Sequence, residues 1–189
     1  MATQIKIGLL VVLAGIVVVV ALGARRTEGA GNEFRFNAAQ LKDKTLWTQV
    51  NAEPYFISSH LAIQCAAPTA TDYEREKQNP HMRMYITVYV NRIGQKAMFS
   101  KNPKFPEGSI IVKEKSSTEA DWRKPVLYTI MRKREAGYNP KVGDWEFSVV
   151  AANGTDMQVT GKLEKCQLCH VETPDRDFIF RDYLSSLNY

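Results

Sequence analysis

The segment Met84-Tyr-Ile-Thr-Val-Tyr-Val90 decides the fold class, because its side chains alternate with the period of two that is typical of a β-strand. One face of this strand would carry Met84, Ile86, Val88 and Val90. Three further strands are predicted at residues 109–113, 126–133 and 145–151. No segment of helix length separates the last two, so the strands should pair antiparallel rather than form a doubly wound parallel sheet.

Short elements are expected around these strands. Residues 152–155, Ala-Asn-Gly-Thr, predict a hairpin turn, and residues 66–80, rich in Pro, Thr, Asp and Glu, predict a surface loop. Asn37 should cap a helix that runs to about residue 50, and residues 95–100 predict a short helix. Thr173-Pro174 should begin a helix that ends near residue 187. The expected fold is α+β, a predominantly antiparallel sheet with a few flanking helices.

The N-terminus predicts a membrane segment. Residues 7–24 contain no charged side chain and, at ~1.5 Å per residue, would span ~27 Å as a helix, close to the thickness of the hydrocarbon layer. Leu22 and Glu28 interrupt the small-residue pattern of a cleavage site, so we favour a retained transmembrane anchor over a removed signal. The expected organisation is an anchor or signal segment at 1–26, a tether at 27–36 and one domain at 37–189.

The net charge does not indicate a nucleic-acid-binding protein. The chain has 25 basic and 20 acidic residues, and three of the basic ones, Lys6, Arg25 and Arg26, lie within residues 1–26. The 22 basic and 20 acidic residues that follow are interspersed, as on an ordinary solvated surface.

The pentapeptide Cys166-Gln-Leu-Cys169-His170 matches the attachment motif of a c-type haem. Each thiol adds to one haem vinyl group, so the two sulfurs must lie one helical turn apart, and the adjoining imidazole can then bind the iron. A zinc site would need another ligand from Cys65, His60 or His81, and a redox dithiol would be expected near the N-terminus, in a βαβ unit. The motif therefore predicts one covalently attached haem c per chain, with His170 on the iron. Since haem c is attached outside the bacterial cytoplasmic membrane, the domain should face the periplasm, anchored by residues 7–24.

Several segments in order resemble the cytochrome P-460 family of c-type haem proteins. They are Tyr85-Ile-Thr-Val-Tyr-Val-Asn91, Phe105-Pro-Glu-Gly-Ser-Ile-Ile-Val-Lys-Glu-Lys115, Tyr128-Thr-Ile-Met-Arg-Lys-Arg-Glu-Ala-Gly-Tyr138, Gly143-Asp-Trp-Glu-Phe147, the haem motif itself and Asp177-Phe-Ile-Phe180. The resemblance implies a mainly antiparallel β fold, usually a homodimer, with one histidine on the iron and the opposite face open to small nitrogen compounds. It also implies that Lys113 matches a lysine bonded to the haem rim in members that oxidise hydroxylamine. A related group, cytochrome c′-beta, shares the fold without this bond and binds nitric oxide.

One departure from the family bears on activity. Hydroxylamine-oxidising members carry a pocket carboxylate. Here the resemblance implies that Thr129 or a neighbour on the strand at 126–133 takes that position, and Glu135 falls beyond the strand. Without a positioned base, proton removal from hydroxylamine would be slower by about 10²–10⁴-fold. Whether the chain is a haem-dependent oxidoreductase is therefore left open.

The sequence is compatible with three functions. The first is a periplasm-facing mono-haem cytochrome that binds or oxidises hydroxylamine or nitric oxide at an open iron and exchanges electrons with a partner cytochrome. The second is an electron-transfer cytochrome, whose sixth iron ligand would come from His60, His81, Met82, Met84, Met98, Met131 or Met157. The third is a non-catalytic nitric oxide binding or sensing protein. Cys65 is left as a spare thiol, buried or joining two protomers.

Overall fold

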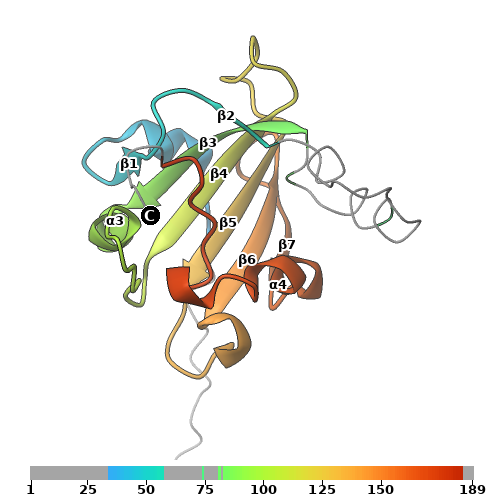
Figure 1. Cartoon of the computed structure of the whole chain (residues 1–189). Coiled ribbons are helices and arrows are strands. Elements are labelled where there is room, and N and C mark those ends of the chain that lie inside the picture. The colour runs from blue at the N-terminus through green and yellow to red at the C-terminus, as the bar shows by residue number, and fades with distance from the viewer. Residues whose placement is uncertain (1–33, 58–73, 75–80, 82, 185–189) are drawn as a thin grey trace, which may run out of the picture. The chain divides into compact units, whose positions relative to one another are not determined.

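An antiparallel sheet of seven strands organises the part of the chain that the structure describes (Figure 1). The structure is a computed structural model and describes residues 34–57, 74, 81 and 83–184. The strands are β1 (Trp47–Gln49), β2 (Tyr55–Ile57), β3 (Met84–Asn91), β4 (Ile110–Ser116), β5 (Leu127–Lys133), β6 (Trp145–Ala151) and β7 (Met157–Gly161). Their order is β1-β3-β4-β5-β6-β7, and β2 pairs with the other half of the edge of β3 that β1 occupies.

The strand predictions are confirmed. The strand at 145–151 has the predicted bounds, and the other three differ by a few residues at their ends. Asn153 and Gly154 lie in the tight connection between β6 and β7, as the hairpin prediction requires. Every strand pair is antiparallel, so the α+β class and the rejection of a parallel sheet are both confirmed.

The register of the central strands gives the sheet one apolar face. Val88 of β3 pairs with Lys113 of β4, which pairs with Thr129 of β5, so every second residue of these strands points to the same side. On that side the sheet packs against residues that follow β3 and against the C-terminal segment. The cluster includes Ile86, Val88, Val90, Met98, Phe105, Ile111, Met131, Val142, Trp145, Phe147, Ile179 and Leu184.

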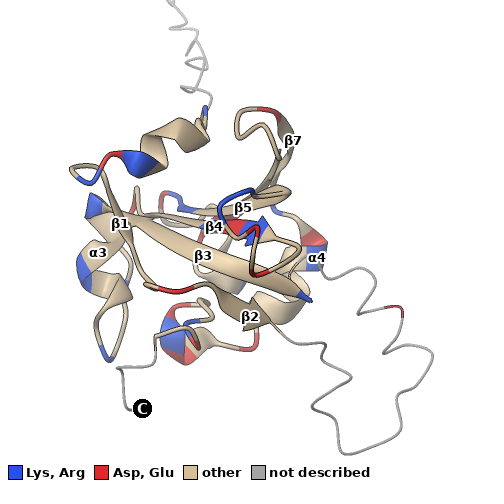
Figure 2. Cartoon of the chain, turned by 90° about the horizontal axis from the view of Figure 1, so that it is seen from above, with Lys and Arg blue, Asp and Glu red and all other residues tan. Residues whose placement is uncertain are grey.

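The opposite face is covered by the N-terminal segment of the domain. Phe36 is 6% exposed and its ring lies 5.8 Å from that of Tyr128. The 3-10 helix η1 (Ala38–Lys42) follows, and the Ala38 amide donates to the Gly154 carbonyl at 2.9 Å. Figure 2 shows η1 on one side of the sheet and α4 (Glu164–His170) on the other.

The helix predicted from residue 37 to about 50 is wrong in length. Asn37 does cap a helix, accepting a hydrogen bond from Ala39, but η1 ends at Lys42. The Asp43 carboxylate accepts the amide and the hydroxyl of Thr45, and this local turn directs the chain into β1. Pairing with β3 then overrides the weak helical pattern.

The helix predicted from Thr173 to about residue 187 is also wrong. Only the 3-10 turn η3 (Pro174–Arg176) forms. The Thr173 hydroxyl donates to the His170 carbonyl and does not cap η3. Asp177 and Phe178 have positive φ angles of 52° and 64°, which end any right-handed helix. The rest of the segment, as far as residue 184, is non-helical, and the remainder lies outside the described residues.

The short helix predicted at 95–100 is confirmed in kind, as α3 (Arg92–Met98), with its N-terminus displaced by three residues. Asn91 caps it by accepting the Gly94 amide at 3.1 Å, and the same side chain accepts the Ile110 amide at 3.0 Å. This one side chain therefore fixes the beginning of α3 against β4.

The predictions for the N-terminus and for residues 66–80 fall outside the described residues, as do His60, Cys65 and Met82. None of the helices in the described ranges has the length and hydropathy needed to cross a membrane. The anchor at residues 7–24 and the boundaries at 26 and 36 stay predictions.

Gly143 makes room for the C-terminal segment. It follows the 3-10 turn η2 (Pro140–Val142) with φ +63°, and a Cβ placed on it would lie 2.6 Å from the Phe178 ring and 3.1 Å from an Asp177 carboxylate oxygen. Only glycine meets both requirements, a left-handed backbone and close approach of an aromatic ring.

We expect Gly143→Ala to destabilise the domain by about 2–4 kcal/mol, because it adds a clash with Phe178 to the strain of a left-handed alanine. Gly137→Ala is the matched control, since Gly137 has φ +89° but a Cβ placed on it would meet no atom within 4 Å. That variant should lose only about 1 kcal/mol. Urea unfolding of the apoprotein measures both values, and equal losses would contradict the steric argument.

Candidate functional site

Helix α4 presents the two cysteines and the histidine of the sequence motif. Cys166 and Cys169 lie three residues apart in this seven-residue helix, and both are half-buried. His170, the last residue of the helix, is 4% exposed. The motif is therefore helical, as the attachment chemistry requires, with its imidazole turned inward.

His170 is held in a defined orientation. Its Nδ1 lies 2.6 Å from the carbonyl oxygen of Phe178, and its ring lies 5.3 Å from that of Phe147 and 5.1 Å from that of Phe180. Because a carbonyl only accepts, Nδ1 carries the proton and Nε2 keeps its lone pair. Burial lowers the pKa of His170 to about 4, with a further lowering from the Lys113 charge, so the ring is neutral near pH 7. A neutral imidazole with a free Nε2 is the form that binds iron.

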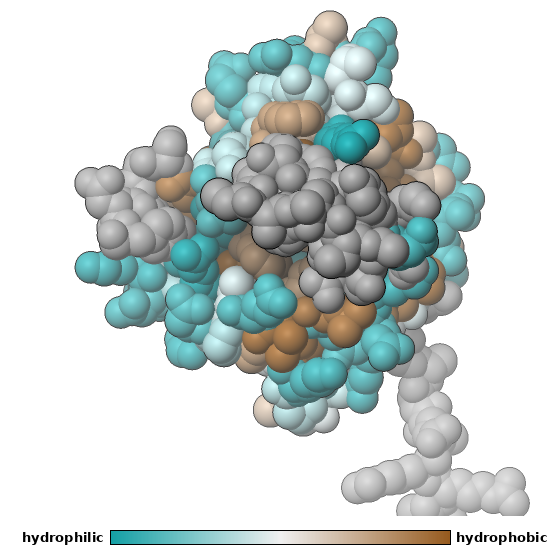
Figure 3. Space-filling model, turned by 45° about the vertical axis from the view of Figure 1, so that its right-hand side comes forward, coloured by the Kyte–Doolittle hydropathy of each residue, from teal (hydrophilic) through white to brown (hydrophobic). Residues whose placement is uncertain are grey.

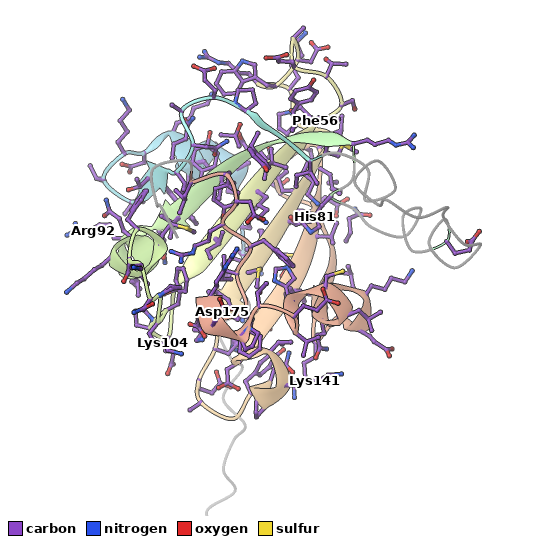
Figure 4. The ribbon with its side chains drawn as sticks, in the orientation of Figure 1. Phe56, His81, Arg92, Lys104, Lys141 and Asp175 are labelled. Atoms are coloured by element: carbon purple, nitrogen blue, oxygen red, sulfur yellow. The ribbon has the colours of Figure 1, made fainter. Side chains whose placement is uncertain are left out.

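A cavity lies between α4 and the sheet. Its lining combines apolar side chains with a few polar groups, and the residues are His81, Ile111, Lys113, Thr129, Ile130, Met131, Phe147, Ser148, Cys166 and His170. Figure 4 shows His81 over the central strands, above α4. The cavity thus brings together β4, β5, β6 and the haem-motif helix.

Two buried lysines lie on the same face of β4, and Lys113 is the one that lines the cavity. Lys113 is 6% exposed, with its Nζ 5.5 Å from the centre of the Tyr183 ring, and Lys115 is 0% exposed. Burial lowers the pKa of Lys113 to about 8, opposed in part by the charge of Asp182. Burial also lowers the pKa of Lys115 well below its usual value, with Lys113 adding to the effect. Near pH 7–8 a fraction of the Lys113 amine is therefore neutral and nucleophilic.

Thr129 lies opposite Lys113 in the β4–β5 register. Its hydroxyl is buried in the wall of the cavity and makes no hydrogen bond within the described part of the chain. A buried hydroxyl without a partner is costly, and such a group is available to a bound molecule.

A family model, Cytochrome P460, matches residues 67–181. The chain belongs to the cytochrome P460 family. This confirms the resemblance noted in the sequence, and it supports haem as the cofactor and iron as the metal. No curated protein matches the chain.

The residues present fit a haem. The donor set on α4 is a neutral imidazole with Nε2 free and two thiols on the same helix, beside a cavity lined by Ile111, Met131 and Phe147. Aromatic and aliphatic walls suit the porphyrin faces, and the histidine suits the iron. No group of three His, Cys, Asp or Glu residues within the described ranges is placed to hold a metal ion, so the zinc alternative gains no support there.

The predicted site residues come together only in part. Lys113, Cys166 and His170 all line the cavity, and Cys169 lies on the same helix. Of the candidate sixth ligands, His81 and Met131 line the cavity, whereas Met84, Met98 and Met157 are not in its lining.

Sequence reasoning missed two groups. Lys115 could have been found from the strand period, because it lies two residues from Lys113 on the same face. The Phe178 carbonyl that holds His170 carries no sequence signal, since any residue supplies a carbonyl.

In the view of Figure 2, basic and acidic residues are interspersed, and the expectation that no nucleic acid binds stays a prediction.

The buried Lys113 should make apoprotein stability depend on pH. Its pKa is lower in the folded state, so the unfolded state binds more protons between about pH 8 and 10.5, and stability rises with pH across this window. We expect wild type to gain up to about 3 kcal/mol more than Lys113→Met over that range, from about 1.4 kcal/mol per pKa unit. Urea unfolding at pH 7.5 and 10 measures the difference. Lys104→Met, at an exposed lysine, should behave as wild type, and parallel curves for all three proteins would show that Lys113 is not desolvated.

Proposed function

We propose that this protein is a mono-haem c-type cytochrome that binds a small nitrogen compound at an open iron site. One haem would be joined through thioether bonds to Cys166 and Cys169, with His170 as the axial ligand on one side. The observation that carries this proposal is the His170 geometry: a buried, neutral ring whose Nδ1 is fixed by the Phe178 carbonyl at 2.6 Å, beside a cavity. When bound, the haem supplies an iron that coordinates the ligand and takes up electrons.

Lys113 is proposed to bond to the haem rim. The position of its amine in the same cavity as His170, and the lowering of its pKa to about 8, support this role. The ring of Tyr183 lies beside the amine. The neutral amine would replace the hydrogen of one carbon on the haem rim, with two electrons and two protons passing to an oxidant such as a peroxide.

The cavity favours ligand binding over hydroxylamine oxidation. Thr129 lies beside Lys113 on the same wall, and no carboxylate is among the described residues that line the cavity. A threonine hydroxyl donates or accepts a hydrogen bond but is not a base at neutral pH. Nitric oxide needs no proton acceptor on binding, whereas hydroxylamine must lose protons to be oxidised, so we propose nitric oxide binding as the main activity.

Electron transfer is the second candidate, and one observation favours it. His81 and Met131 both line the cavity, and either side chain is able to bind iron as a sixth ligand. Burial and the nearby lysines lower the pKa of His81 well below its usual value, so its imidazole is neutral near pH 7. A closed sixth position would make the protein an electron carrier.

The cellular setting is also proposed. We infer a bacterial periplasmic domain, anchored to the cytoplasmic membrane by residues 7–24, that assembles as a homodimer and exchanges electrons with another cytochrome. Leu168 supports a docking face next to the haem, because it is 61% exposed on the helix that carries both cysteines. On the face drawn in Figure 3, apolar residues are exposed among hydrophilic ones.

Peptide mapping tests the attachment. After expression with a c-type maturation system, proteolysis of wild type should leave haem on the peptide with Cys166 and Cys169 and also on the peptide with Lys113. In Lys113→Arg the peptide that contains residue 113 should carry no haem, because a guanidinium is not nucleophilic, and the peptide with Cys166 and Cys169 should keep it. Cys166→Ser with Cys169→Ser should abolish stable haem incorporation, and Cys65→Ser should match wild type. Haem lost from denatured wild type would contradict covalent attachment.

The absorption spectrum of the reduced protein tests the coordination. We expect a five-coordinate iron that shifts on adding nitric oxide. His81→Ala and Met131→Leu should leave the spectrum unchanged, because neither side chain binds the iron in the open-site proposal. A low-spin wild-type spectrum that becomes five-coordinate in one of these variants would establish the electron-transfer alternative and name its ligand.

A further inference from the structure

We propose that Trp145 and Asp177 are positioning residues for the iron ligand His170, which they control through the carbonyl that accepts its Nδ1 proton. This inference rests on the proposed function, because it assigns His170 to the iron. It adds a link between the central sheet and the haem that runs through hydrogen bonds of residues outside the cavity lining.

The link begins with an unusual backbone corner. Asp177 and Phe178 are consecutive non-glycine residues with φ angles of 52° and 64°. Left-handed conformations cost roughly 1–2 kcal/mol for each such residue, and they persist only where surrounding contacts hold them. The carbonyl that accepts from His170 belongs to the second of these residues.

Four hydrogen bonds to residues remote in sequence hold the first residue of the corner. The Asp177 carboxylate accepts the Phe105 amide at 2.8 Å and makes two bonds to Lys133 Nζ, at 2.8 and 2.9 Å. The Asp177 carbonyl accepts the indole Nε1–H of Trp145 at 2.8 Å. Asp177 is 6% exposed and Trp145 is 0% exposed, so water cannot easily replace these bonds.

Two of the three donor residues lie on strands of the central sheet. Lys133 and Trp145 are a register pair on β5 and β6, and Lys133 Nζ lies 5.1 Å from the centre of the Trp145 ring. The Phe105 ring packs against Trp145 with centroids 5.4 Å apart. The corner is thus held from two sides, by the sheet and by local bonds from the Asp177 and Phe178 amides to the carbonyls of Pro174 and Thr173, at 3.2 and 2.8 Å.

The consequence reaches the iron through the imidazole. A short bond from Nδ1–H to a carbonyl makes the ring a stronger electron donor at Nε2, which stabilises ferric iron and strengthens the iron–histidine bond. If the corner moved, the bond at 2.6 Å would lengthen and the ring would turn between Phe147 and Phe180.

Trp145→Phe tests the link because it removes the indole donor and keeps an aromatic ring. In the haem-loaded full chain we expect a lower iron–histidine stretching frequency in the resonance Raman spectrum of the reduced protein, and a higher reduction potential. Trp47→Phe is the matched control, since Trp47 is a buried indole on β1 that plays no part in these bonds. It should change neither quantity.

Asp177→Asn is the second variant, for the case in which Trp145→Phe does not fold. Asparagine tolerates the left-handed backbone and keeps an acceptor for Phe105, but it loses the charge that binds Lys133. It should shift both quantities in the same direction. If the reduced wild type is six-coordinate, the test uses only the reduction potential and not the iron–histidine stretching frequency.

The outcomes separate this inference from the proposed function. A colourless wild type overturns both. A coloured wild type whose potential and spectrum are unchanged in Trp145→Phe and Asp177→Asn overturns only the positioning role. Equal shifts in Trp145→Phe and Trp47→Phe also overturn it, because they would reflect general loosening of the domain.

Discussion

The register between β4 and its neighbours β3 and β5 determines both the core and the cavity. Lys113 pairs with Val88 on one side and with Thr129 on the other, so the three side chains share a face with Ile111 and Met131. A slip of one residue would turn Lys113, Lys115 and Thr129 to the opposite face, where Phe36 and the N-terminal segment pack. The core residues of the same strands would move with them. The chemistry of the site and the stability of the domain therefore depend on the same hydrogen-bond ladder.

The segment that follows α4 forms a second layer against the sheet with little regular secondary structure, and its side chains bond to backbone groups of residues 98–105. Asp177 bonds to Phe105, 72 residues away, and the guanidinium of Arg181 donates to the carbonyls of Met98 and Ser100. Arg181 is 0% exposed, so these bonds form away from water, where they contribute most to fixing a loop. An irregular segment held in this way is able to place a single carbonyl against His170, which a continuous helix over the same residues would have used within itself.

These two layers differ in how far the sequence could predict them. The strands follow from alternation that is visible over five to eight residues, and the haem motif is local, so both were predicted. The helices expected at 37–50 and 173–187 failed because local turns at Asp43 and Asp177 compete with the helical pattern, and the partners of Asp177 are remote in sequence. The position of Lys115 on the same face as Lys113 could have been predicted from the period of the strand. The carbonyl that accepts from His170 could not, because every residue has a backbone carbonyl and only the folded corner sets its direction.

The composition of the cavity bears on which ligand it accepts. The described lining residues include one histidine besides His170, one lysine and a threonine hydroxyl, with a second buried lysine close by and no carboxylate. His81 is neutral near pH 7 and is thus able to accept a proton, but its pKa is lowered by burial and by both lysines, so a proton held there would be lost readily. Lys113, if bonded to the haem, would no longer be a free amine. The groups that remain donate hydrogen bonds more readily than they take up protons, and this asymmetry suits a ligand such as nitric oxide, which binds without releasing protons.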